Sequence, residues 1–406
     1  MGARSMMANC SNELPDNELK EGAKFSSDIC IGLRISIPDR IFQLMFSYLS
    51  VDELNSVSLT CHALHNAVCK YVAIDAPKRF TQEVTENESM LGKARSNSHA
   101  WGVSLIRCKN KSVYDYAVWG QCFLGFCSNW SHKACSDFLN SVIRFTDSAR
   151  MLSAVISSKV GKNHQLEMEV RRRFHGFFID QFARSESEQG FWLSALLRTQ
   201  KSIAEQGRLF LLLFGPVKYV HGEEQIDWCL MSEEIFTKSR CVQILKPLSS
   251  NLYCLLKTAM LKSKFSWSNS EVFMLMEEII NVPQVWLLQN FASFLLLQPK
   301  LIQIALHYRI CYGQCKEAAH VFHAMKMVYY RWGYGIVECL LAPLLETFQS
   351  LSFPLRRQFL AEIILTQSQL LDGYLQRLPF NRLQFLDEVT ASSAILPLLS
   401  MLATDI

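Results

Sequence analysis

Residues 34–76 carry three short runs in which apolar side chains recur every three or four positions, the spacing of one helix face. The first run follows Pro38, whose missing amide proton costs nothing in the first turn of a helix. Its apolar positions are Ile41, Leu44, Met45, Tyr48 and Leu49. The second run begins where Ser50 and Glu53 have the spacing of a capping box. The third run is formed by Cys61, Leu64, Val68 and Tyr71, so the pattern predicts three short helices.

This segment has more apolar positions than so small a unit can bury. A domain of about 40 residues is marginal without disulfides, a metal or a partner. Phe42, Phe46 and Leu59 add to the runs already named, so some apolar side chains must face something other than these three helices. The pattern leaves two alternatives open: the segment packs on the rest of the chain, or it docks onto another protein.

The rest of the chain, from about residue 77 onward, is patterned as helices throughout. One stripe starts near residue 164 and comprises Leu166, Val170, Phe174, Phe177, Phe178 and Phe182. Ser268 and Glu271 form another candidate capping box. The stripe behind it comprises Val272, Phe273, Met276, Ile279 and Ile280. No Asn-Gly or Asp-Gly pair between alternating runs signals a hairpin.

These elements predict an all-α fold, in which an N-terminal three-helix unit is followed by an extended α-helical region. Helices in series that bury one another indicate an α-solenoid or a layered helical bundle. No repeat of fixed period is found, so no named repeat family is assigned. The expected divisions are a flexible N-terminal tail over 1–33, the three-helix unit over 34–76, a helical region over 77–215 with a candidate linker near 81–101, and a C-terminal helical domain over 216–406.

Composition narrows the classes that this pattern allows. Of 406 residues, 50% are hydrophobic and 19% are charged, so the chain has enough apolar surface to fold. A net charge of +4 is too small to indicate a nucleic-acid binder. The longest unbroken apolar run spans 209–214, far short of the roughly 20 residues that cross a bilayer. Because its 14 cysteines come without a secretion signal, we expect reduced thiols in a soluble, intracellular protein that does not contact membranes.

Two groups of cysteine and histidine residues are candidates for zinc ligands. The first comprises Cys122, Cys127, His132 and Cys135, and its spacing differs from that of zinc fingers and knuckles. The second comprises Cys311, Cys315, His320 and His323, with too few residues between its two pairs for a finger. We therefore expect that the chain binds no metal and needs no cofactor.

No motif for catalysis is found. The chain lacks His-Glu-x-x-His, Gly-x-Ser-x-Gly and Gly-x4-Gly-Lys-Ser/Thr sequences, and adjacent acids such as Glu223 and Glu224 point in different directions on a helix. Arg171, Arg172 and Arg173 are suited to contact phosphate, but on the polar side of an amphipathic helix they are more typical of a solvated face. We expect neither an enzyme nor a protein that binds nucleic acid directly.

Residues 37–61 combine four spaced features: an aliphatic residue before a proline, a helix ending in Tyr-Leu, an Asp-x-Leu sequence and a Ser-x-x-Cys sequence. Together these features resemble an F-box. Three positions depart from the family pattern. Arg40 stands where the family favours an acid, Thr60 replaces a common valine, and Leu64 stands where a tryptophan is usual.

In the F-box family this module binds a Skp-type adaptor, which bridges to a cullin scaffold and its RING subunit. By position, the resemblance implies adaptor contacts at Ile37, Pro38, Ile41, Leu44, Met45, Leu49, Leu54, Val57, Leu59 and Cys61. It implies a ubiquitin-ligase substrate receptor whose helical C-terminal region presents an unknown protein substrate, so that its mechanism is positioning rather than chemistry. The alternative is a non-enzymatic helical scaffold that recruits no ligase.

The layout of the whole chain, an F-box followed by a long helical part without a named repeat, also resembles one member of this family. That resemblance implies a setting in meiotic germ cells and a location in the nucleus, the cytoplasm or both. Composition and spacing say nothing about either expectation.

Overall fold

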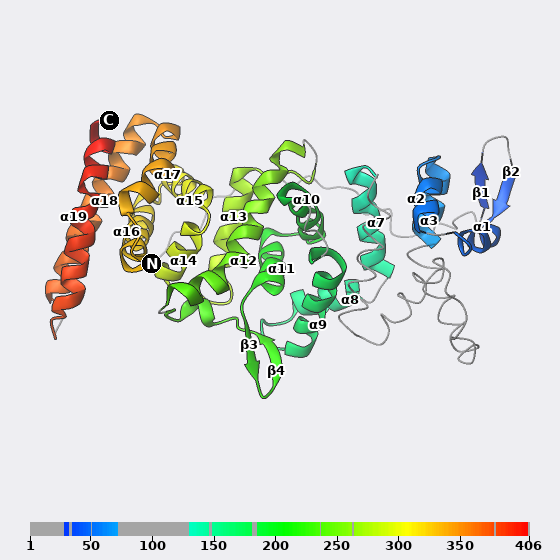
Figure 1. Ribbon diagram of the computed structural model, residues 1–406, viewed down its shortest axis with the longest axis horizontal. Coiled ribbons are helices and arrows are strands. Elements are labelled where there is room, and N and C mark those ends of the chain that lie inside the picture. The colour runs from blue at the N-terminus through cyan, green and yellow to red at the C-terminus, as the bar shows by residue number, and fades with distance from the viewer. Residues whose placement is uncertain are drawn as a thin grey trace, which may run out of the picture.

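The structure of the protein is a computed structural model that describes residues 28–31, 35–49, 51–71, 130–145, 148–180, 185–235, 237–261, 264–376 and 379–404. The described part is elongated, with helices α1–α3 at one end and α18–α19 at the other (Figure 1). It is largely helical, which confirms the predicted all-α fold with an extended helical region. The candidate linker near 81–101 lies outside the described residues.

Three short helices and a small hairpin make up the N-terminal unit. The helices are α1 (Asp39–Phe46), α2 (Val51–Ser58) and α3 (His62–Lys70), as the pattern predicts. Ser50, the first residue of the predicted capping box, lies outside the described residues.

The hairpin of the N-terminal unit extends into the segment that the sequence assigns to a flexible tail. Strand β1 (Asp28–Ile31) pairs antiparallel with β2 (Ile35–Pro38). The register places Ile29 opposite Ile37 and Ile31 opposite Ile35. The segment expected as a tail, 1–33, therefore overlaps this hairpin, and its residues 1–27 lie outside the described residues.

The remaining helices form what we call the array, α7–α19. Its first helices are α7 (His132–Phe145), α8 (Ser148–Ser157), α9 (His164–Phe174), α10 (Glu186–Leu197) and α11 (Ile203–Phe214). They are followed by α12 (Lys238–Leu256), α13 (Asn269–Asn281), α14 (Leu288–Leu296), α15 (Pro299–Cys311), α16 (Cys315–Trp332), α17 (Ile336–Ser350), α18 (Phe353–Gln376) and α19 (Arg382–Thr404). Short 3-10 turns occupy Leu230–Ser232 and Lys257–Leu261.

From α10 onward the helices alternate between two layers. In one layer α10, α12, α14, α16 and α18 each pack against the next, and in the other layer α11, α13, α15, α17 and α19 do the same. Stacked helix pairs of this kind are the repeat units of an α-solenoid. The packing of α10 on α12 and of α11 on α13 continues across residues 215 and 216. One array therefore runs through the point where the sequence suggests a domain boundary.

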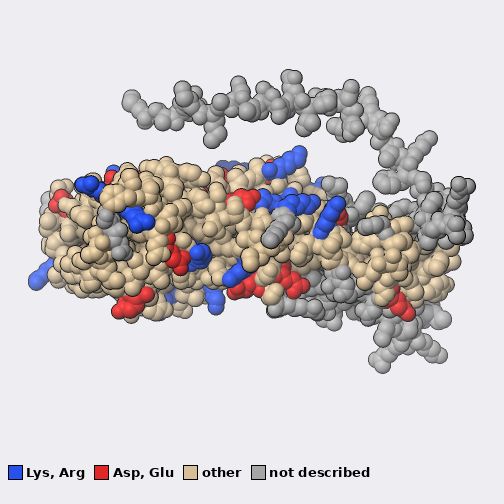
Figure 2. Space-filling view, turned by 90° about the horizontal axis from the view of Figure 1, so that it is seen from above, with Lys and Arg blue, Asp and Glu red and all other residues tan. Residues whose placement is uncertain are grey.

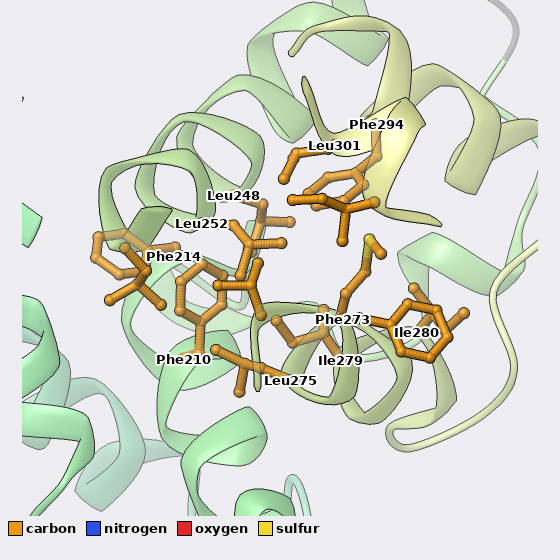
Figure 3. Close-up of a cluster of buried hydrophobic side chains, with 14 of the residues drawn as sticks. Phe210, Phe214, Leu248, Leu252, Phe273, Leu275, Ile279, Ile280, Phe294 and Leu301 are labelled. Carbon is orange, nitrogen blue, oxygen red and sulfur yellow. The ribbon is translucent and has the colours of Figure 1, made fainter. Parts of the chain in front are cut away.

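Large apolar side chains fill the space between the two layers. Figure 3 shows one cluster in which helices α11 to α15 meet, and its labelled residues are Phe210, Phe214, Leu248, Leu252, Phe273, Leu275, Ile279, Ile280, Phe294 and Leu301. Most of these side chains are completely buried. Because full burial of one such side chain stabilises by about 1.5–3 kcal/mol, this cluster ties five successive helices together.

The capping box predicted at Ser268 is present. Ser268 Oγ accepts a hydrogen bond of 3.2 Å from the Glu271 backbone amide, and Glu271 Oε2 accepts one of 2.9 Å from the Ser268 amide. The apolar stripe behind it is buried, as predicted. The stripe that begins at Leu166 is less regular, because α9 ends at Phe174 and a π-helical turn follows over His175–Ile179.

A second hairpin, which the sequence pattern misses, projects from the array beyond α11 (Figure 1). Strand β3 (Val217–Val220) pairs antiparallel with β4 (Glu223–Ile226). The two residues between them, His221 and Gly222, have φ angles of 52° and 83°. Two positive φ angles are the requirement of a type I′ turn, and histidine is enriched at such angles among residues other than glycine. The expectation of no hairpin fails because His-Gly makes the turn in place of Asn-Gly.

Candidate functional site

Helix α1 presents two apolar faces, of which only one belongs to the core of the N-terminal unit. Phe42 and Phe46 are 3% and 2% exposed, and the Phe46 ring lies 5.6 Å from that of Tyr71 in an edge-on arrangement. Leu54 from α2 and Val68 from α3 are completely buried beside them. The unit therefore closes its core without using the opposite face of α1.

The opposite face of α1 is the stripe that the sequence predicts. Ile41, Leu44 and Met45 are each about half exposed, at 49%, 50% and 53%, and Tyr48 in the turn after α1 is 75% exposed. Leu59, between α2 and α3, is exposed as well. Clusters of large exposed apolar side chains mark protein interaction sites more often than they mark ordinary surface. We call Ile41, Leu44 and Met45 the α1 face.

The structure places the ten predicted contact residues in different environments. Six of them are exposed: Pro38, Ile41, Leu44, Met45, Leu59 and Cys61. Leu49 and Val57 are half-buried. Leu54 is 0% exposed and lies in the core of the unit, so within this structure it supports the site and is not part of its surface. The side chain of Ile37 lies outside the described residues.

Leu64, which stands where the F-box pattern has a tryptophan, is half-buried against the core of the unit. A tryptophan does lie nearby, but it comes from the chain just before α7. The indole of Trp130 is 9% exposed, and its ring centroid lies 4.3 Å from that of His65 on α3. Trp130 Nε1 donates a hydrogen bond of 2.9 Å to Ser58 Oγ at the end of α2. The sequence pattern assigns no role to Trp130.

A pocket of about 380 Å³ opens at this joint between the N-terminal unit and α7. Its lining residues are Ser58, Leu59, Thr60, Cys61, His65, Trp130, Ser131 and Ala134. Leu59 and Cys61 are also predicted adaptor contacts. The candidate site therefore borders α7, the first helix of the array. Trp130, just before α7, packs against the residues at this border.

The two candidate zinc groups are engaged in other ways where they are described. Cys122 and Cys127 lie outside the described residues, and Cys135 is buried in the apolar core. In the second group, His323 Nε2 donates a hydrogen bond of 2.8 Å to the backbone carbonyl of Ile363. Among the residues that the structure describes, no three His, Cys, Asp or Glu side chains gather as metal ligands.

The three consecutive arginines of α9 are bound to partners within the chain. Arg171 donates to two backbone carbonyls at the end of α11, at 2.8 and 3.1 Å, and its burial lowers its pKa to about 10. Arg173 pairs with Glu169 at 2.7 Å, and Arg172 pairs with Glu224 at 3.4 Å. Lys and Arg are also interspersed with Asp and Glu on the face that Figure 2 shows. Arg171 holds α9 against the end of α11, so its guanidinium is engaged within the chain.

Comparison with known proteins identifies the helical array. A family model described as "FBXO47, ARM repeats" matches residues 144–406, which is more than half of the chain. The chain belongs to the FBXO47 ARM-repeat family. This finding corrects the conclusion that no named repeat family applies. The pairs of the array begin at residues 186, 238, 288, 315 and 353, and this uneven spacing hides the repeat from a search for a fixed period.

Two curated relatives also match the chain. The chain is 23% identical to F-box only protein 47 of Homo sapiens over 311 residues, which cover 68% of this chain and 66% of that protein. It is 23% identical to F-box only protein 47 of Mus musculus over 296 residues, which cover 64% and 63%. The chain thus spans just under two thirds of the length of these relatives. The predicted resemblance of the chain to F-box only protein 47 is confirmed.

Proposed function

We propose that this FBXO47-family chain is the substrate-recognition subunit of a Skp-cullin-F-box-type ubiquitin ligase. The α1 face carries the proposal, because its large apolar side chains stay exposed although Phe42 and Phe46 already close the core of the unit. The sequence pattern alone left open whether these residues pack on the rest of the chain. Their exposure favours docking onto another protein, and the F-box resemblance implies that this protein is a Skp-type adaptor.

The proposed mechanism is positioning. The N-terminal unit binds the adaptor and, through it, a cullin-RING scaffold, while the array binds a protein substrate. Holding both on one chain raises the effective concentration of the substrate at the ubiquitin-loaded enzyme. No catalytic group of this chain takes part, in keeping with the absence of catalytic motifs in its sequence.

Capture by a purified Skp-type adaptor tests the proposal. Replacing Leu44 and Met45 together with glutamate puts two carboxylates into the contact, and burying each without a partner costs several kcal/mol. We expect adaptor affinity to fall by at least about 100-fold, which corresponds to about 2.7 kcal/mol. The thermal melt stays unchanged, because both side chains are half exposed in the free protein. Unchanged capture would contradict the F-box assignment.

Two further variants serve as controls for this experiment. Met260→Glu adds a charge at a side chain that is 86% exposed on the array, so neither capture nor melt changes. Leu54→Glu forces a carboxylate into the closed core, so it unfolds the N-terminal unit and loses capture for that reason. Lost capture with an intact melt is expected only of the Leu44 and Met45 variant.

The alternative function is a helical scaffold that recruits no ligase, and the specific observation in its favour is Leu64 in place of the usual tryptophan. A scaffold predicts that the unaltered protein, intact by its melt, captures no adaptor at micromolar concentration. If the missing tryptophan is the reason that the unaltered protein captures no adaptor, Leu64→Trp should create adaptor capture.

We place this activity in the nucleus or cytoplasm of meiotic germ cells, which is the setting that resemblance to F-box only protein 47 implies. Imaging of the tagged endogenous protein in gonad and somatic tissues tests this placement. Signal confined to somatic cells would contradict it.

A further inference from the structure

Helices α18 and α19, the last described pair of the array, expose several large apolar side chains on their outer side. Helix α18 packs on α16 through Phe359 and Ile363, which are completely buried. Ile364 and Leu365, one and two positions further along, are 59% and 51% exposed. In a solenoid this is the side on which a following repeat would pack.

Helix α19 has the same two-sided character. Its inner side is buried against the array through Ala391, Ile395, Leu398 and Leu402. Its outer side exposes Leu396 and Met401. The last 16 residues of the helix, 389–404, contain no charged residue. The exposed surface of α18 and α19 is what we call the end face, and it lies at the opposite end of the molecule from α1–α3 (Figure 1).

By length and mean hydropathy alone, α19 would also pass as a membrane span. Its packing argues against that role. Glu388 on α19 is 2% exposed and forms an ion pair with Lys326 of α16, which is 0% exposed. Lys326 also donates to Gln367 of α18 at 2.7 Å and to Ser392 of α19 at 3.0 Å. Withdrawing α19 into lipid would leave a buried charge without its partner, so α19 stays on the array.

We propose that the end face binds the end face of a second copy of this chain, which gives a two-fold symmetric dimer. In such a dimer both copies use the same surface patch, so every contact between two residues occurs twice. The α19 half of the end face has no charged residue along 389–404, so it meets no like charge when it meets itself. On the α18 half, Arg357 and Asp372 are exposed. Homodimer interfaces are also the more apolar class of protein interface.

The size of the end face fits a stable dimer. Helices α18 and α19 have 24 and 23 residues, so each is about 35 Å long at 1.5 Å per residue. Two helices of about 10 Å diameter side by side cover about 700 Å². A standard specific interface buries about 800 Å² on each partner. The pair therefore supplies nearly the whole area without help from the rest of the array.

The oligomeric state of the full chain tests this proposal. Light scattering after size exclusion at about 10 µM should give twice the chain mass of 46.5 kDa. Leu365→Glu combined with Leu396→Glu should give the single chain mass with an unchanged melt, since both side chains are more than half exposed. Met260→Glu, a matched apolar-to-acid change away from the end face, should remain a dimer.

Three results would overturn the proposal. The unaltered chain could have the mass of a monomer at 10 µM, or the double glutamate variant could remain a dimer. The unaltered chain could also be a monomer that sediments with vesicles of phosphatidylcholine and phosphatidylserine, in which case the end face contacts lipid. If the double glutamate variant melts early, Leu365→Ser with Leu396→Ser replaces it and must still give the mass of a monomer.

Discussion

Trp130 Nε1 donates a hydrogen bond of 2.9 Å to Ser58 Oγ, and this contact joins the array to the N-terminal unit. The indole also lies edge-on against the His65 ring of α3. Trp130 therefore helps to hold the N-terminal unit against the start of α7. Because the proposed mechanism is positioning, a residue at this joint bears on function without touching either partner.

Trp130→Ala should loosen the joint while leaving adaptor capture intact. Truncating a large buried aromatic side chain costs about 3–5 kcal/mol at the site, so backbone amides of α3 should exchange hydrogen at least about tenfold faster. Ser58→Ala removes only the hydrogen-bond acceptor and should have a smaller effect, of about 1 kcal/mol. Unchanged protection of α3 in the Trp130→Ala protein would show that the joint does not depend on this side chain.

Two glycines in helices should respond to alanine in opposite directions. A Cβ at Gly190 of α10 would lie 2.1 Å from the backbone carbonyl oxygen of Cys254 on α12, so Gly190→Ala forces the two helices apart. We expect a loss of about 1–3 kcal/mol or more. A Cβ at Gly373 of α18 meets nothing within 4 Å, so Gly373→Ala should gain about 0.5–1 kcal/mol from helix propensity. Thermal melts of the two variants measure both effects, and equal shifts would contradict the close approach of α10 and α12.

Removing one partner of the buried Lys326–Glu388 pair should destabilise the protein far more than replacing both partners with apolar residues. Burial lowers the pKa of Lys326, while the adjacent carboxylate of Glu388 opposes that shift. Lys326→Met leaves Glu388 buried without its partner and should lower the stability of the last repeats by about 3–5 kcal/mol. Combining Lys326→Met with Glu388→Leu should recover most of that loss. Urea titration of the three proteins gives the comparison, and equal losses in the single and double variants would count against the pair.

His323 should make the array less stable in mild acid. Burial, with a smaller contribution from Lys326, lowers the pKa of His323 from 6.5 to about 4. Between these two values the unfolded chain binds a proton that the folded chain does not, so stability falls as the pH drops from about 6.5 to 4. The slope approaches about 1.4 kcal/mol per pH unit. The melting temperatures of the unaltered protein and of His323→Gln, measured across this pH range, should converge as the pH falls. A constant difference between the two melting temperatures would show that His323 does not titrate this way.

Apolar periodicity was sufficient to find the helices because each helix buries one side against its neighbours. The box at Ser268 and Glu271 and the stripe behind it appear where the pattern puts them. Periodicity could not say which side of α1 is buried, since Phe42 and Phe46 on one side and Leu44 and Met45 on the other are equally apolar. The sequence therefore predicts the candidate site only as a set of apolar residues, and among them Leu54, predicted as an adaptor contact, lies in the core of the unit.

Features that depend on contacts distant in sequence were beyond the pattern. Trp130 meets Ser58 and His65 across more than 60 residues, and nothing in its local sequence indicates that contact. The β3–β4 hairpin depends on positive φ angles at His221 and Gly222, a conformation that His-Gly adopts less often than Asn-Gly does. The repeat escaped detection because the lengths of the helices and loops vary from pair to pair.

The alternation of the array between two layers also determines how it loses structure. Among the described residues, the main contacts of each helix in the array are with helices no more than three positions away along the chain. The free energy of unfolding is then close to a sum of terms for neighbouring pairs, and melting starts at an end. The chain can lose α18 and α19 while α10–α13 stay folded around their shared apolar core. Low contact order also favours fast refolding of the lost pair, so the array behaves as a row of coupled segments rather than as one all-or-none unit.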